Sequence, residues 1–331
     1  MVPTTLETSS ARASAGSAVD VSIIIVNYNT AHLLDRVFDT IDAARANLNI
    51  EIIAVDNASS DSSVVELRDR SDIAALVENE VNVGFGRANN QALALCNGRY
   101  VLLLNTDAFV SSDTLTKTID YMDTNLSTGV LGVKLVGPNG ELQPSCRYFP
   151  TPWNSFLMRS GLARFFPHVR VVDDLAWDHA SVRTCDWVPG CYYLIRREVI
   201  DAVGLFDPLY FLYFEEVDHC RAVRAAGWTV TFYPLTSVIH MGGESAKSEG
   251  ALSVAGKQIS PLQIESELLF FRKHHGLGGV LSWVLLCAVW DVLRASKNLV
   301  LLRTSSRTTL SHVGATLKTL VVTRFASRAS R

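Results

Sequence analysis

The stretch that decides the fold is YVLLLNTDAFV, which runs from Tyr100 to Val110. It begins with the apolar residues of a buried strand and then presents Asn105, Thr106 and Asp107 at the point where such a strand ends. A core strand that delivers a carboxylate to its carboxyl end needs a reason for doing so. The rest of the sequence supplies one.

Three earlier segments repeat the same strand, loop and helix pattern. VSIIIV, at 21–26, is followed by the polar NYNT and a helical pattern, and IEIIAV, at 50–55, is followed by Asp56, Asn57 and a helix capped by Ser and Asp. ALVENEVNVGFGRANNQALALC adds a third strand, a glycine-containing turn and a helix. Strands that alternate with helices predict a parallel sheet with helices on both faces.

Polar side chains end three of these strands, namely Asn27, Asp56 and Asp107. Open parallel sheets bind ligands in the crevice beyond the carboxyl ends of their strands. Taken alone, Asp56 is equally well explained as a helix cap and Asp107 as a turn residue. Three successive polar strand ends favour a binding site at this edge of the sheet.

The second half of the chain has a different pattern. We expect a helix at 115–122, a hairpin turn at 137–140, an aromatic-rich covering segment to about residue 180, a strand at 193–195 and a helix at 198–203. After these, PLYFLYFEEVDHC carries Glu215, Glu216 and Asp218 where a helix begins, a place at which the helix dipole favours negative charge.

Composition excludes several classes of protein. The 331 residues are 48% hydrophobic and 19% charged with a net charge of -3, which argues against disorder and against affinity for nucleic acid. The six cysteines form no CxxC pair, as expected in a reduced, cytosolic setting. Residues 1–20 are rich in Ser, Ala and Thr without a secretory apolar run, and we expect a disordered leader.

The end of the chain is basic and amphipathic. Residues 291–331 contain eight Lys and Arg against one Asp, about +7, which leaves about -10 for the rest. The apolar run LGGVLSWVLLCAVW is shorter than the ~20 residues of a spanning helix. A helical face is predicted for Leu310, Val313, Leu317, Leu320 and Val321. The pattern suits peripheral binding to an anionic membrane, and its alternative is a helical bundle that packs on the domain or forms a homodimer.

Seven segments together resemble the inverting glycosyltransferases of family 2, whose nucleotide-binding fold is called GT-A. They are VSIIIVNYNT, VDNASSDSS, NVGFGRANNQAL, LLLNTD, VPGCYYLIRREVIDAVGLFD, YFEEVDHCRAVRAAGW and HMGGES, in the family's order between residues 21 and 245. Within the family, the sequence is most similar to the rhamnosyltransferase-like branch of bacteria, which builds cell-surface polysaccharide.

The resemblance implies an α/β fold with a Rossmann-like, mostly parallel sheet flanked by helices. We expect a catalytic domain at 21–260, with a nucleotide-binding half at 21–110 and an acceptor half at 111–260, and the pattern of the tail predicts a helical, membrane-associating extension at 261–331. The implied partners are a dTDP- or UDP-linked sugar donor and a saccharide or lipid-linked acceptor. The implied location is the cytoplasm, at the inner face of the plasma membrane.

The resemblance also assigns the donor site. Asp107 resembles the metal-binding member of the family's DxD motif, Asn105 stands in place of the first Asp, and His240 resembles a downstream metal or diphosphate ligand. One carboxylate suffices for Mg²⁺ or Mn²⁺, since these ions also take phosphate oxygens and waters. The nucleotide site implied by the resemblance comprises Asn27, Tyr28, Asn29, Asp56, Asn57, Asn82, Gly84, Arg87, Asn89, Asn105 and Thr106.

For catalysis, the resemblance makes Glu216 the base that takes the proton of the acceptor hydroxyl, with Glu215 as the fallback if the match shifts by one residue. Arg147, Trp187 and Gly190 are assigned to the acceptor and sugar pocket. Asp218 is expected to pair with Arg221 within the helix as structural support.

Two functions of other classes share this layout. A sugar nucleotidyltransferase should carry a glycine-rich, basic loop after the first strand, and NYNT is not one. A non-catalytic carbohydrate-binding protein would not need Asp107, Glu216 and His240 together. NVGFGRANN follows the third strand and lacks the G-x-G-x-x-G spacing, which disfavours a dinucleotide fold.

Overall fold

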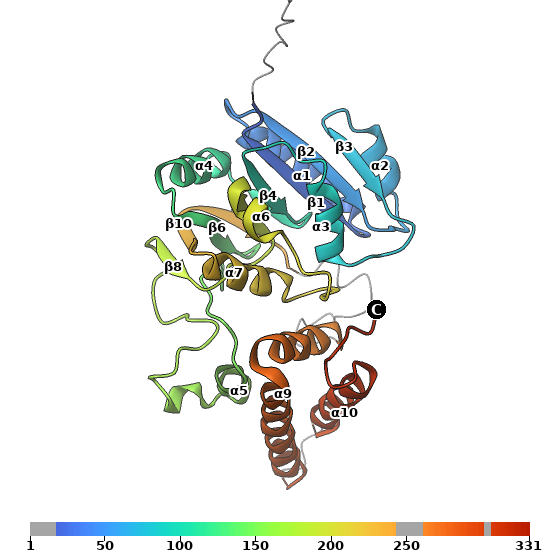
Figure 1. The fold of residues 1–331 in the computed structure, drawn as a ribbon, viewed down its shortest axis with the longest axis vertical. Helices are drawn as coiled ribbons and strands as arrows, with labels where there is room; N and C mark the ends of the chain where they lie inside the picture. Colours follow the sequence, from blue (N-terminus) through green and yellow to red (C-terminus); the bar gives the residue numbers. More distant parts are fainter. Residues whose placement is uncertain (1–17, 243–260, 301–305) are drawn as a thin grey trace, which may run out of the picture.

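The structure is a computed structural model that describes residues 18–242, 261–300 and 306–331. A sheet flanked by helices forms the upper part of Figure 1, and the helices α9 and α10 lie side by side below it. The predicted leader at 1–20 falls almost wholly outside the described residues, as does the part of the predicted catalytic domain at 243–260.

The first half of the chain folds as the strand and helix pattern predicts. Neighbouring residues of β1 alternate between two cores, because successive side chains of a strand point to opposite faces: Ile23 and Ile25 belong to one core and Ile24 to the other. The elements are β1 (Val21–Asn27), α1 (Ala31–Ala44), β2 (Ile50–Asp56), α2 (Ser63–Asp69), β3 (Ala75–Glu78), α3 (Phe85–Leu93) and β4 (Tyr100–Leu104).

The register of these strands sets which polar ends meet. The order β3-β2-β1-β4 is parallel throughout, and β1 pairs with β2 so that Asn27 lies opposite Asp56. The predicted parallel sheet is therefore confirmed for this half. An antiparallel strand, β9 (Tyr192–Arg196), continues the sheet next to β4, and its direction was not predicted.

The second half completes the sheet and brings distant residues to the end of β4. Within the described residues ten strands form one sheet, in which β10 runs parallel to β6 and antiparallel to β5. The β10 to β5 register places His240 opposite Ala108, next to Asp107. The strands are β5 (Ala108–Val110), β6 (Thr128–Val136), β7 (Leu142–Gln143), β8 (Arg183–Cys185) and β10 (Thr229–His240).

Helices cover both faces of the sheet (Figure 1). The core with α1 and α4 contains Leu34, Phe38 and Ile119, whereas Val199, Val217 and Val223 of α6 and α7 belong to the other core. The predicted hairpin turn at 137–140 joins β6 to β7. The remaining elements are α4 (Thr114–Thr124), α5 (Pro152–Ser160), the 3-10 helix η1 (Leu162–Phe165), α6 (Arg197–Val203) and α7 (Glu215–Ala225).

The C-terminal extension consists of α9 (Pro261–Val300), kinked at Gly276, and α10 (Ser306–Val322). Gly276 has φ 67, a left-handed conformation that favours glycine. The apolar run is shorter than a spanning helix, but α9 extends well beyond this run. Among the described residues, Pro261–Asn298 is long and apolar enough to cross a membrane by length and composition, a criterion that core helices also meet.

Candidate active site

A cavity of about 250 Å³ opens at the carboxyl ends of β1 and β4 and is closed by the loop before α7. Eleven of the residues predicted for the site line this cavity, so the structure brings together most of the predicted donor residues and both candidate bases. They are Tyr28, Asn57, Asn82, Gly84, Asn105, Thr106, Asp107, Gly190, Glu215, Glu216 and His240.

Asn27 and Asp56 lie behind the cavity wall and do not line it. The Asn27 amide donates to Asp56 Oδ1 at 2.9 Å, and the other Asp56 oxygen accepts from the Ser59 backbone N–H at 2.9 Å. Thr30 Oγ1 links this pair to Thr106, because it contacts both Asn27 Oδ1 and Thr106 Oγ1. In this structure the two residues support the loops that carry the cavity residues.

Three other residues predicted to bind nucleotide lie away from the cavity. Asn29 accepts a hydrogen bond from the Ser60 backbone and holds the loops after β1 and β2 together. Arg87 was expected to face the cavity. Its guanidinium instead donates to the carbonyl of Pro208 at 2.8 Å. Asn89 lies within α3 and donates to the Phe85 carbonyl one turn earlier.

Gly84 joins two walls of the cavity. Its φ of 90 is a conformation that side chains disfavour, and a Cβ there would lie 2.3 Å from the carbonyl oxygen of Phe211. The same carbonyl accepts a hydrogen bond from the backbone of Phe85 at 2.9 Å. Asn82 Oδ1 accepts from the Gly84 N–H and from the Asn57 amide. A glycine is therefore required where the loop after β3 meets the loop before α7.

Asp107 and His240 face each other at the end of the sheet. Asp107 Oδ1 lies 3.6 Å from His240 Nε2, and Asp107 Oδ2 accepts from the Gly242 N–H at 3.1 Å. The other ring nitrogen of His240, Nδ1, lies 2.8 Å from Gln143 Oε1. Asn105 Oδ1, in the same wall, is buried without a hydrogen-bond partner among the described residues.

Asp107 and His240 are suited to bind a divalent cation whose other ligands come from a bound phosphate and from water. Two ligand atoms that are each about 2.1 Å from one ion lie at most about 4.2 Å apart, and the 3.6 Å between Asp107 Oδ1 and His240 Nε2 meets this limit. The described residues contain no group of three or more His, Cys, Asp and Glu that could hold a metal by themselves. The remaining ligands would be phosphate oxygens and waters, as Mg²⁺ and Mn²⁺ commonly accept.

Two carboxyl groups, those of Glu215 and Glu216, also line the cavity. Glu215 Oε2 and Glu216 Oε2 are buried and, within the described part of the chain, neither has a hydrogen-bond partner. Burial raises the pKa of Glu215 well above its usual range, and the neighbouring Glu216 raises it further. Burial also raises the pKa of Glu216, while backbone hydrogen bonds and the charge of Arg147 act in the opposite direction. The positive charge of Arg147 thus favours the ionised form of Glu216.

The chain enters α7 through a strained backbone. Tyr213 and Phe214 are non-glycine residues with φ 71 and 69, and such conformations cost on the order of 1–3 kcal/mol each. Contacts with α9 hold them: Ser266 Oγ donates to the Leu212 carbonyl at 2.7 Å, and the rings of Phe214 and Phe270 lie 5.3 Å apart. The first part of α9 therefore fixes the loop that positions both candidate bases.

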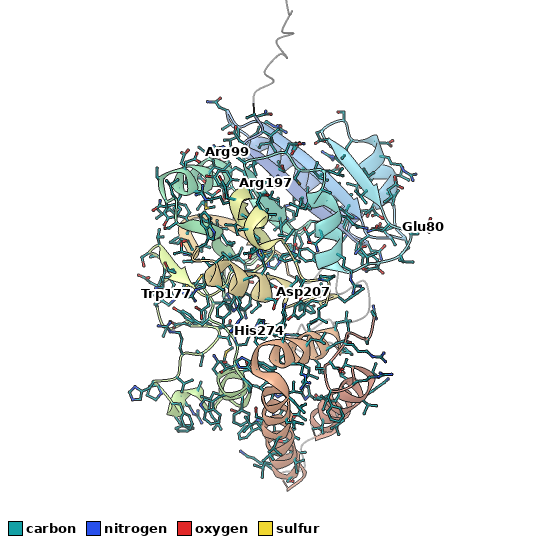
Figure 2. The ribbon with its side chains drawn as sticks, in the orientation of Figure 1. Glu80, Arg99, Trp177, Arg197, Asp207 and His274 are labelled. Carbon is teal, nitrogen blue, oxygen red and sulfur yellow. The ribbon has the colours of Figure 1, made fainter. Side chains whose placement is uncertain are left out.

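Asp218 strengthens the same junction. The expected pair with Arg221 was wrong, because Asp218 binds residues of α9 instead. Its Oδ2 accepts from Lys273 Nζ at 2.7 Å and its Oδ1 lies 2.6 Å from His274 Nε2. Lys273 also binds Asp207 at 2.6 Å, and Figure 2 shows Asp207 and His274 between α7 and α9. Asp218 is buried, and the positive charge of Lys273 on α9 compensates its negative charge. Arg221 lies over the ring of Phe149.

Arg147 and Trp187 lie next to the acids but do not line the cavity. The guanidinium of Arg147 stacks over the Trp187 ring at 4.1 Å and pairs with Asp173. The Trp187 indole donates to the Tyr148 carbonyl at 2.9 Å. Since Arg147 lowers the pKa of Glu216, its charge reaches the acidic wall of the cavity.

Several lining residues were not predicted. They are mostly apolar: Val26, Phe85, Pro189, Cys191, Phe211, Leu212 and Tyr213. Three of them belong to PLYFLYFEE, where the aromatic cluster beside the acids was the available signal. Gln143 had no signal, because its contact with His240 joins residues that are 97 positions apart.

The chain is similar in sequence to known glycosyltransferases. Residues 22–169 match the profile of the family Glycosyl transferase family 2. The chain is similar to the N-acetylglucosaminyl-diphospho-decaprenol L-rhamnosyltransferase of Mycobacterium tuberculosis (strain H37Rv). The two are 25% identical over 255 residues, and the matched region covers 72% of this chain and 81% of that protein. It is 26% identical over 173 residues to the rhamnosyltransferase WbbL of Escherichia coli (strain K12), with 50% of this chain and 63% of that protein covered.

Solved structures show the same fold. The mannosyltransferase PcManGT from Pyrobaculum calidifontis, solved with GDP-Man and Mn²⁺, superposes with a TM-score of 0.51 at 17% identity, over 93% of this chain and 88% of that one. GalNAc-T7, solved with UDP, GalNAc and Mn²⁺, gives a TM-score of 0.54 at 14% identity, over 77% and 48% of the two chains. These likenesses show the GT-A fold.

Proposed function

We propose that this chain, which has a GT-A fold and whose residues 22–169 form a glycosyltransferase family 2 domain, transfers a sugar with inversion from a nucleoside diphosphate to a saccharide or lipid-linked acceptor. One observation carries the proposal. The same cavity is lined by the pair Asp107 and His240 and by Glu215 and Glu216, whose buried Oε2 atoms have no hydrogen-bond partner among the described residues. In the proposal, the first pair serves the diphosphate and the acids accept the proton.

The donor end of the cavity would bind the diphosphate. Asp107, His240 and Asn105 would hold Mg²⁺ or Mn²⁺ there, and the ion when bound would stabilise the charge that develops on the departing diphosphate. Tyr28, Asn57 and the loop at 82–84 line the neighbouring part of the cavity, where the nucleoside would lie. Similarity to two rhamnosyltransferases supports rhamnose as the sugar and N-acetylglucosamine on a polyprenyl diphosphate as the acceptor.

The acidic end would activate the acceptor. In an inverting transfer, a base removes the proton of the acceptor hydroxyl while that oxygen attacks the anomeric carbon from the face opposite the leaving group. Glu216 lines the cavity beside Gly190, and a Cβ on Gly190 would be 3.9 Å from the Cβ of Glu216. The missing side chain leaves room for an acceptor next to the carboxylate. Burial keeps this group basic, because it disfavours the charged form.

Ligand-induced stabilisation tests donor binding. Purified protein would be heated with UDP- and dTDP-linked sugars, each with and without Mn²⁺. A donor present at 100 times its Kd stabilises the fold by about 2.7 kcal/mol. We expect stabilisation by at least one sugar nucleotide to depend on the metal. If none of the sugar nucleotides stabilises the protein, with or without Mn²⁺, the proposed donor site is wrong.

The charge of Arg147 should set the pH dependence of transfer. Glu216 acts only when ionised, so kcat/KM should fall as the pH drops through its raised pKa. Arg147→Met removes a charge that lowers this pKa, and the acid limb of the profile should therefore move to higher pH. The matched control is Arg183→Met, because Arg183 also stacks on a tryptophan, Trp177, at 3.6 Å. An acid limb that moves equally in both variants, or in neither, would refute the role of Arg147.

The C-terminal helices support a location at the inner face of the plasma membrane, where a lipid-linked acceptor would lie. One side of α9, called the outer face here, is apolar and 48 to 64% exposed; it comprises Leu281, Leu285, Val289, Val292 and Leu293. Asp291, the acidic residue of this helix after Gly276, is instead buried and 2% exposed. It pairs with Arg159 and His312. This part of the helix therefore has its acidic side chain inside and apolar side chains outside.

Two further features favour an anionic lipid surface over a second copy of the chain. The exposed hydroxyls of Ser282 and Ser296 donate to carbonyls of their own helix, at 3.0 and 2.9 Å, and so need no water. Asp291 is the only acidic residue after Gly276, so the charges around the outer face are positive. Anionic lipid attracts such a surface, whereas a second copy would repel it.

α10 contributes to this surface differently from the prediction. Leu317 and Val321 are exposed, whereas Leu320 is buried and 5% exposed, so the expected single face is divided between the interior and the surface. The side chain of Leu310 lies outside the described residues. Because Leu320 and Trp283 belong to the main core, a truncation near His275 would uncover apolar surface. Substitution on the outer face is the cleaner test of membrane binding.

The double variant Leu285→Glu, Val289→Glu should release the protein from anionic vesicles. Each apolar side chain contributes roughly 1.5–3 kcal/mol when buried, so the partition coefficient should fall at least ~10-fold in a sedimentation assay. Leu126→Glu is the control, because Leu126 is 70% exposed but lies before β6. If wild type stays in the supernatant, or if the double variant only converts a dimer to a monomer, the outer face is not a membrane surface.

A further inference from the structure

The contacts of Gln143 with His240 determine which ring nitrogen of His240 carries the proton. The Gln143 side chain makes two contacts with the same residue: Nε2 donates to the His240 carbonyl at 2.8 Å, and Oε1 lies 2.8 Å from His240 Nδ1. A backbone carbonyl only accepts hydrogen bonds, so the amide NH₂ must face it. The amide oxygen must then face the ring and accept a hydrogen bond from it.

A proton on Nδ1 determines the state of the other nitrogen. In a neutral imidazole one nitrogen carries the proton and the other carries a lone pair. With Nδ1 protonated, the lone pair of His240 is on Nε2, which lies 3.6 Å from Asp107 Oδ1. Two acceptors thus face each other across the donor end of the cavity. Such a pair is suited to a cation and cannot be joined by a simple hydrogen bond.

We propose that Gln143 is a positioning residue that fixes the Nδ1–H tautomer of His240 and so keeps Nε2 free to bind the divalent cation. The inference rests on the proposed metal-assisted function. Gln143 reaches His240 from β7, whose pairing with β6 sets Gln143 opposite Leu135. Without this acceptor the ring is free to protonate Nε2 and donate to Asp107, a hydrogen bond that would occupy both metal ligands.

The test uses metal-free full-length protein labelled with ¹⁵N-histidine, at pH 8. The ¹⁵N shifts of His240, assigned by comparison with His240→Asn, should show Nδ1–H in wild type. Gln143→Leu should shift the ring toward Nε2–H. Its Kd for Mn²⁺, measured from the EPR signal of free Mn²⁺, should rise about 10- to 100-fold, as is typical when a residue that orients a ligand is lost.

Two controls separate this role from support of the hairpin. Gln143→Glu keeps an acceptor for Nδ1–H but loses the donor to the backbone, so it should retain the tautomer and Mn²⁺ binding. Leu142→Ala changes the neighbouring residue of β7, which is 36% exposed, and should bind Mn²⁺ as wild type does.

An Nε2–H tautomer in wild type, or equal losses of Mn²⁺ binding in Gln143→Leu and Gln143→Glu, would overturn the inference. An unchanged Mn²⁺ affinity in Gln143→Leu would also overturn the inference. In that case, binding of Mn²⁺ by the wild-type protein would still support the proposed function. If wild type binds sugar nucleotides but no Mn²⁺, the metal part of the proposed function fails and the role of Gln143 fails with it.

Discussion

Glu216→Gln should lower kcat by roughly 10²-fold or more while leaving donor binding intact, because the variant keeps the shape of the side chain but cannot accept a proton. Glu216 faces the cavity beside Gly190, and the charge of Arg147 favours its ionised form. The measurement is a steady-state assay of transfer, with donor affinity measured separately by calorimetry.

Glu215→Gln is the matched control, because the two acids are neighbours on one helix and both carry an unpaired buried oxygen. Its side chain is 3% exposed and is less suited to meet an acceptor. A large loss of kcat in Glu215→Gln with little loss in Glu216→Gln would reverse the assignment.

Stability shows whether the Glu216→Gln protein is a fair comparison. The folded-state pKa of Glu216 is raised above its value in the unfolded chain, so wild type loses stability as the pH rises through that pKa. The Gln variant has no such loss and should be at least as stable at pH 8. Below the unfolded pKa, both side chains are neutral and this difference should disappear. Equal or greater stability of the Gln variant at pH 8 would exclude a folding defect as the cause of the lost turnover.

Asp107→Ala should abolish metal-dependent donor binding and lower kcat/KM by roughly 10²- to 10³-fold, the range of several kcal/mol of charge stabilisation. Asp107 is the carboxylate that faces His240 Nε2, and its neighbour in the cavity lining, Asn105, supplies only a neutral oxygen. Calorimetry with UDP and dTDP sugars, with and without Mn²⁺, measures the effect.

Asp113→Ala controls for the loss of an aspartate in the same region, because Asp113 is half-exposed and pairs with Lys117 outside the cavity. Asp107→Asn keeps an acceptor for the Gly242 N–H and guards against a local unfolding effect. Donor affinity and turnover that survive in both Asp107 variants would show that the carboxylate does not serve the donor.

The sequence predicted the features that depend on local patterns. Apolar runs followed by polar strand ends identified β1, β2 and β4, and a parallel sheet necessarily gathers Asn57, Asn105 and Asp107 at one edge. The acidic start of α7 was equally visible, since Glu215 and Glu216 follow a cluster of aromatic residues.

Long-range pairing set the features that the pattern could not predict. The partners of Asp218 lie 55 and 56 residues later on α9, so a local i, i+3 pair with Arg221 was the natural expectation. Arg87 was expected in the nucleotide site, but its guanidinium donates to the carbonyl of Pro208, 121 residues away. The apolar run at 277–290 is only part of α9, so the run alone did not show the length of the helix.

The most direct test of glycosyl transfer follows both products of one reaction. Wild type with Mn²⁺ would be incubated with dTDP-rhamnose or UDP-sugars and an N-acetylglucosaminyl polyprenyl diphosphate, and the products would be measured by mass spectrometry. The account predicts one nucleoside diphosphate released for each sugar transferred, an inverted anomeric centre by NMR, and loss of both products in Glu216→Gln. Formation of a sugar nucleotide from a nucleoside triphosphate and a sugar phosphate, or release of nucleoside diphosphate with no sugar on the acceptor, would contradict it.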